Sequence, residues 1–123
     1  MNPVQQTAPP QPPDLAAALE RLWQRHLPEI ESRLDILDSA AAATAASALT
    51  PDQKQAAHAA AHKLAGVLGS FGLSQATDPA RETERLYAAD SPPSRESAAR
   101  LARMAATLRS LVANHMRPQP PAK

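Results

Sequence analysis

The chain has 123 residues, a formal net charge of +1 at pH 7, 43% hydrophobic residues and no cysteine. These values predict one domain and exclude a disulfide framework, a zinc site built from thiolates and thiol redox chemistry. Scattered lysines and arginines and only one Trp, one Tyr and one Phe give no footprint for nucleic acid. The N-terminus lacks a basic start, and no apolar run is long enough to cross a membrane, so we expect a cytoplasmic protein without a membrane span.

Alanine and leucine supply most of the apolar residues, which predicts an all-α fold. Both ends of the chain are rich in proline, and we expect residues 1–13 and 117–123 to be disordered tails around a folded unit over 14–116. A proline-motif ligand for a partner domain is the alternative interpretation of these ends.

The first helical pattern begins with Asp14 as a cap and carries leucines and Trp23 at helical spacing up to Leu27. Pro28 is expected to kink or break it, which predicts a short first helix. From Glu29 a second, longer helix runs into the alanine-rich segment 39–48.

Three further helices have start signals of their own. Thr50 and Gln53 form a capping box around Pro51, which opens a third helix that ends near Gly72. Asp78 followed by proline opens a fourth helix, and a fifth runs from Arg95 to about residue 115 with an apolar stripe. We therefore expect an antiparallel four-helix bundle with a short extra N-terminal helix packed over one end.

On a helical wheel of the third helix, His62 lies almost opposite an apolar arc formed by Ala57, Ala60, Leu64, Val67, Leu68 and Phe71. The neighbours of His62 on its own face are mostly small: His58, Ala59, Ala65, Gly66 and Gly69, with Gln55. A glycine inside a helix costs about 1 kcal/mol relative to alanine. One interpretation is that these glycines let a bulky group reach His62, and the alternative is tight packing between helices beside a solvated histidine.

The stretch "HKLAGVLGSFGL" resembles the phosphorylation-site helix of histidine-containing phosphotransfer (HPt) domains. That pattern has histidine, an aliphatic residue at +2, glycine at +4, and an apolar residue then glycine at +9 and +10, which here are His62, Leu64, Gly66, Phe71 and Gly72. Less specifically, "LERLWQRHLPEIESRLDILDSA" is similar to the lead-in helix, proline and long second helix of that family.

The resemblance implies a phosphoryl carrier of a two-component phosphorelay rather than an autonomous enzyme. His62 would accept the phosphoryl group on Nε2 from one receiver-domain aspartate and pass it to another. Response-regulator receiver domains and a hybrid histidine kinase are the implied partners. Magnesium is expected in the receiver, so the chain needs no cofactor or metal of its own, and the docking surface would comprise His58, Ala59, Ala65, Gly66, Gly69 and Arg81.

One departure from the family pattern concerns charge. Many family members carry lysine at +3, where this chain has Ala65. Lys63 could bend back to neutralise the phosphoryl group, and His58 could do so when protonated. In the fourth helix the spacing brings Glu84 opposite the histidine and Arg81 one turn earlier; because a glutamate would repel a phosphate, we favour Arg81.

Three alternatives to a phosphoryl carrier are weighed. A degenerate HPt domain could act as a helical adaptor that docks to a receiver or another signalling protein without being phosphorylated. His58 and His62 have the HxxxH spacing of metal ligands but no third ligand nearby in sequence. Hydrolytic catalysis lacks a cysteine nucleophile, and Ser70 has no histidine one turn away. The residues predict no particular oligomeric state.

Overall fold

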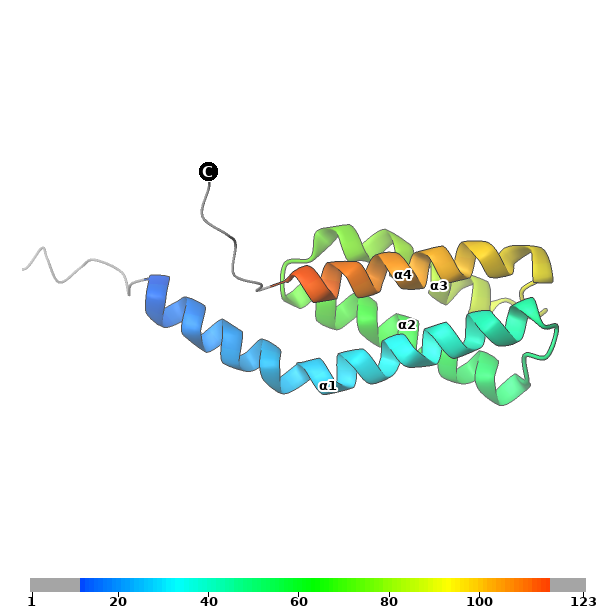
Figure 1. The fold of residues 1–123 in the computed structure, drawn as a ribbon, viewed down its shortest axis with the longest axis horizontal. Helices are drawn as coiled ribbons and strands as arrows, with labels where there is room; N and C mark the ends of the chain where they lie inside the picture. The colour runs from blue at the N-terminus through cyan, green and yellow to red at the C-terminus, as the bar shows by residue number, and fades with distance from the viewer. Residues whose placement is uncertain (1–11, 116–123) are drawn as a thin grey trace, which may run out of the picture.

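A computed structural model describes residues 12–115 of the chain as an antiparallel bundle of four α-helices (Figure 1). The helices are α1 (Pro12–Ala45), α2 (Pro51–Ser70), α3 (Thr77–Ala88) and α4 (Ala98–Asn114), with 3-10 turns η2 (Ser74–Ala76) and η3 (Arg95–Ser97) before α3 and α4. The prediction of an all-α bundle is confirmed. The expected tails fall outside the described residues, except for Pro12 and Pro13 in the first turn of α1.

The prediction of a separate short first helix is wrong, because α1 continues through Pro28. Proline removes one helical hydrogen bond and crowds the carbonyl four residues earlier, and α1 bends where its colour passes from blue to cyan (Figure 1). Two buried side chains on either side of the proline, Trp23 and Ile30, pack both halves against the same core. Tertiary packing therefore outweighs the local cost of the proline.

The N-terminal half of α1 does not lie over the end of the bundle as expected. It projects beyond the other helices (Figure 1), and three of its leucines remain exposed: Leu15, Leu19 and Leu22. Where this half joins the bundle, Trp23 packs edge-on against Phe71 and His115 with ring centroids 5.1 and 4.4 Å away. This aromatic cluster closes the end of the core.

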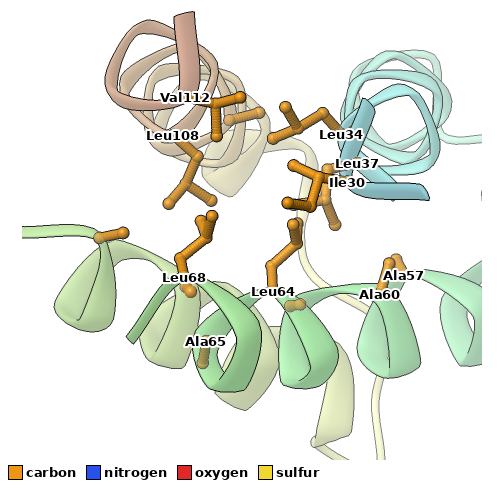
Figure 2. Close-up of a cluster of buried hydrophobic side chains, with 14 of the residues drawn as sticks. Ile30, Leu34, Leu37, Ala57, Ala60, Leu64, Ala65, Leu68, Leu108 and Val112 are labelled. Carbon is orange, nitrogen blue, oxygen red and sulfur yellow. The ribbon is translucent and has the colours of Figure 1, made fainter. Parts of the chain in front are cut away.

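The core lies between α1, α2 and α4, whose aliphatic side chains point toward one another (Figure 2): Ile30, Leu34, Leu37, Leu64, Leu68, Leu108 and Val112. The apolar arc that the wheel predicts for α2 is confirmed, since Ala57, Ala60, Leu64 and Leu68 are buried and Val67 and Phe71 are partly buried. Each large aliphatic side chain buried in this way contributes about 1.5–3 kcal/mol.

Local signals fix both ends of α2. At its start the capping box is present, with the amide of Gln53 donating to Thr50 Oγ1 at 3.1 Å and the amide of Thr50 donating to Gln53 Oε1 at 2.9 Å. At its end Gly72 has φ +82°, and the amide of Leu73 donates to the carbonyl of Leu68 at 3.0 Å. This is a Schellman turn, in which a left-handed residue that is best filled by glycine stops the helix.

The remaining helices hold the bundle closed. The starts predicted near Asp78 and Arg95 are confirmed to within a few residues. Arg109 of α4 donates to Asp35 and Asp38 of α1 at 2.8 and 2.7 Å, and these bonds raise the pKa of Arg109 above its usual value. Among the helices of residues 12–115, none combines the length and the apolar character that crossing a bilayer requires.

Candidate functional site

His62 stands in the middle of α2 on the side away from the leucine core, as the wheel predicts. Its side chain is 62% exposed, and its Nδ1 lies 2.8 Å from Oε2 of Glu84 on α3. A helix interior gives each side chain a fixed direction, so the imidazole is held from two sides: by its backbone on α2 and by a carboxylate on the neighbouring helix.

The contact with Glu84 determines which ring nitrogen of His62 is available for chemistry. An ionised carboxylate only accepts hydrogen bonds, so Nδ1 carries the ring proton and donates a hydrogen bond to Glu84. In the neutral ring the other nitrogen, Nε2, then holds the lone pair. Within residues 12–115 nothing hydrogen-bonds to Nε2, and 62% of the side chain is exposed, so this lone pair has no partner among the described residues.

Glu84 has two further neighbours, and together the four residues form the α2–α3 polar cluster: His58, His62, Arg81 and Glu84. His58 Nε2 lies 3.7 Å from Glu84 Oε2, and Arg81 Nη1 lies 3.5 Å from Glu84 Oε1. Glu84 is the least exposed member, at 19%. The spacing predicts Glu84 opposite His62, and Glu84 does contact the imidazole. Arg81, which the sequence analysis favours as the residue beside a phosphoryl group, contacts Glu84 instead.

Gly66 and Gly69 lie on the exposed side of α2, one and two turns after His62. A Cβ atom added to either glycine would meet nothing within 4 Å, and neither glycine has a positive φ. Packing between this chain's own helices therefore does not require them, which contradicts the tight-packing alternative. Together with the exposed Ala59 they leave a bare surface beside His62, called here the small-residue surface: Ala59, Gly66 and Gly69.

The placement of Ala65 on the outward arc is wrong. Ala65 is only 5% exposed, and its side chain points away from the Leu64 and Leu68 cluster (Figure 2). The reason is that α2 has two neighbouring helices, α1 on one side and α3 on another, with α3 in the more extensive contact. Its buried arc is therefore wider than one apolar stripe and includes Ala61 and Ala65.

Lys63 and a metal ion remain to be placed. Lys63 is exposed and forms no ion pair with the described residues, and its role as a charge neutraliser stays a prediction. Over residues 12–115, no group of three or more His, Cys, Asp or Glu side chains has an arrangement that could hold a metal ion. Among the described residues, the hydrogen-bond partner of His62 is the carboxylate of Glu84.

Comparison with known families gives the site a context. The family model described as "Hpt domain" matches residues 13–111, which covers all four helices of the bundle except the last residues of α4 and the first of α1. The chain belongs to the Hpt domain family. Membership of that family assigns it a phosphotransfer-type role, and Hpt domains interact with receiver domains and kinases in phosphorelays.

A curated protein also resembles this Hpt domain. This chain is similar to Protein RcaC of Microchaete diplosiphon, with 38% identity over 68 residues, which is 55% of this chain and 10% of that protein. The chain thus spans about a tenth of the length of that relative. No solved structure matches the chain.

Proposed function

We propose that this Hpt domain carries a phosphoryl group on Nε2 of His62 between the aspartates of receiver domains. The observation that carries the proposal is the geometry of one ring: Nδ1 is held by Glu84 at 2.8 Å while Nε2 faces outward beside the small-residue surface. A neutral imidazole is a nucleophile near pH 7 and leaves readily once it is phosphorylated.

The transfer balances without any proton leaving the ring. The lone pair on His62 Nε2 attacks the phosphorus of a receiver aspartyl phosphate, the nitrogen–phosphorus bond forms, and the bond from phosphorus to the aspartate oxygen breaks. The aspartate leaves as a carboxylate, and the ring gains a positive charge while Nδ1 keeps its proton. Glu84 faces that charge directly, and in the return step the imidazole leaves as the neutral ring.

Glu84 also fixes the orientation of the imidazole, which matters because phosphoryl transfer depends on in-line approach. In metal sites, a histidine that binds the metal with one ring nitrogen and donates to a carboxylate with the other is oriented and made more basic in the same way. By family resemblance, the receiver's magnesium ion supplies most of the charge neutralisation of the transferring group. This chain's own part is to present, orient and charge-balance the nucleophile.

The small-residue surface is where the receiver would close over His62. A side chain at Gly66 or Gly69 would stand between the imidazole and an approaching active-site loop. We place receiver docking on this surface together with the exposed parts of His58 and Arg81, and without Ala65, which is buried.

The test is to incubate the protein with receiver domains charged by acetyl phosphate and to measure phosphorylation of the chain. We expect a label that is stable to base, labile to acid, and lost in the His62→Gln variant. The His26→Gln variant, which changes a histidine outside the α2–α3 polar cluster, is the matched control and should keep the label. Labelling that persists in His62→Gln would overturn the proposal.

The adaptor alternative has one observation in its favour: Glu84 places a negative charge beside the ring that would receive a phosphoryl group. The same experiment separates the two functions. Tight receiver binding that His62→Gln does not change, together with no label in the wild-type chain, would replace the carrier with an adaptor.

A further inference from the structure

His58 takes no part in the making or breaking of bonds just described, yet it contacts the same Glu84 oxygen atom as the reacting ring. His58 Nε2 lies 3.7 Å from Glu84 Oε2, the same oxygen that accepts from Nδ1 of His62 at 2.8 Å. The side chain of His58 is 34% exposed, against 62% for His62. One carboxylate oxygen therefore lies between two imidazoles that stand one helical turn apart.

We propose that His58 is a proton-dependent positioning residue: when protonated, it balances the charge of Glu84 and so stabilises the phosphorylated form of His62. This inference rests on the proposed function, since it concerns the state in which His62 carries the phosphoryl group. It assigns the regulation of the site to pH, through a residue that the phosphoryl group itself need not touch.

The charges around the cluster show why a second cation is needed. A phosphoryl group brings a charge of about −1.5 to −2 at neutral pH. Glu84 adds another negative charge beside the ring, and its fixed cationic neighbour is Arg81, whose guanidinium lies 3.5 Å away and is 53% exposed. An ion pair so exposed is strongly screened. The positive ring of phosphorylated His62 offsets one of these negative charges, so the phosphoryl group and the Glu84 carboxylate together still leave a net negative charge, which a further cation would balance.

His58 is the group placed to supply that cation. The charged or titratable groups around it are His62 and Lys54 on α2, each one turn away, and Glu84 on α3 with Arg81 behind it. Lys54 forms no ion pair with the described residues, and its spacing puts it farther from Glu84 than His58 is. Histidine is the side chain that normally gains or loses its charge between pH 5 and 8, so the balance of the cluster changes within that range.

Thermodynamic linkage gives the proposal its measurable form. If a proton on His58 stabilises the phosphoryl group on His62, the phosphoryl group must strengthen proton binding at His58 by the same free energy. Phosphorylation should then raise the pH at which His58 is half protonated. For charges separated by about one helical turn at a protein surface, we expect a rise of about 0.5 to 1 pH unit, or about 3- to 10-fold in proton affinity.

The first experiment follows the ring resonances of His58 by NMR from pH 5 to 8.5. His62 is phosphorylated chemically with phosphoramidate, so that no receiver is needed. The expected rise in the half-protonation pH supports the proposal, and a change below about 0.2 pH unit overturns it.

The second experiment measures how fast the His58 variants and the wild type lose the phosphoryl group from His62, and compares them with one another at each of two pH values. His58→Gln should lose the phosphoryl group about 3- to 10-fold faster than the wild type at pH 6 and at nearly the same rate at pH 8.5. His58→Lys, which places a permanent cation there, should be slow at both pH values. A merely structural role for His58 would make both variants fast at every pH, and that result would overturn the proposal.

The two proposals fail in different ways. If phosphoramidate labels His62 but charged receivers do not, the relay function fails, while the NMR titration still decides the role of His58. If receivers label His62 and the titration of His58 does not respond, the relay stands and this inference fails.

Discussion

The two faces of α2 belong to one 20-residue helix but have opposite properties. The inner face carries Leu64 and Leu68, both fully buried between α1 and α4. The outer face carries His62 and two glycines whose missing side chains leave open space. The fold accounts for every residue of the inner face, whereas the glycines of the outer face weaken the helix and have no packing partner. Residues that the fold does not need are where the function is to be sought.

The largest effect should come from the inner face. Leu64→Ala removes a fully buried side chain and leaves a cavity, so we expect it to lower the free energy of unfolding by about 2–5 kcal/mol. Urea denaturation measures this loss. At a temperature where the variant is folded, its His62 should still accept the phosphoryl group. A loss below about 1 kcal/mol would show that the core is looser than the structure has it.

Gly66→Leu should raise stability and lower phosphoryl transfer, the opposite of what Leu64→Ala does. A Cβ atom at this position meets nothing within 4 Å, and leucine improves helix propensity, so stability should rise by up to about 1 kcal/mol. Phosphoryl transfer should fall about a hundredfold, because a displaced receiver loses in-line geometry. Gly66→Ala is the matched control, with the same gain in helix stability and a much smaller loss of transfer. Normal transfer in Gly66→Leu would refute the docking role of the small-residue surface.

Glu84→Gln separates the charge of the carboxylate from its shape. Glutamine can still accept from Nδ1 of His62 but no longer balances the positive ring, so the initial rate of phosphorylation should fall about tenfold. The control is Glu82→Gln on the same helix, where the carboxylate pairs with Arg100 instead. Equal rates in the two variants would remove Glu84 from the mechanism.

The smallest effect concerns His115, a partly buried histidine whose ring packs against Trp23 at the end of the core. Its Nε2 is buried without a hydrogen-bond partner in the described chain, and burial lowers its pKa below the usual 6.5. The unfolded chain then binds the proton more readily, so stability is lost as the pH falls through 6.5 toward the lower folded-state value. His115→Phe should remove this part of the pH dependence, because phenylalanine does not titrate. The urea midpoints of the wild type and of His115→Phe at pH 5 and 7.5 measure this effect. The same change of midpoint with pH in both proteins would contradict it.

Much of this arrangement follows from local sequence signals. Helical periodicity predicts the inner face of α2 and the outward direction of His62, and the capping box and Gly72 predict its two ends. These features depend on residues within a few positions of one another. The motif around His62 carries the resemblance to the Hpt family for the same reason.

The features that sequence reasoning missed depend on contacts between helices. A wheel shows one apolar stripe, so it cannot reveal that Ala65 is buried by a second neighbour, α3. Spacing places Glu84 opposite His62, but it does not show that the carboxylate accepts a hydrogen bond from Nδ1 or that Arg81 pairs with Glu84. Pro28 reads locally as a break, and only the packing of Trp23 and Ile30 shows that α1 continues.

The contact between His62 and Glu84 also has a kinetic consequence. It joins residues 22 apart in the chain, on consecutive helices, whereas Arg109 reaches Asp35 across 74 positions. Closing the longer segment costs about 1 kcal/mol more in chain entropy, and short-range contacts form faster. During folding, the α2–α3 hairpin should therefore assemble the reactive histidine and its carboxylate before α1 docks onto α4.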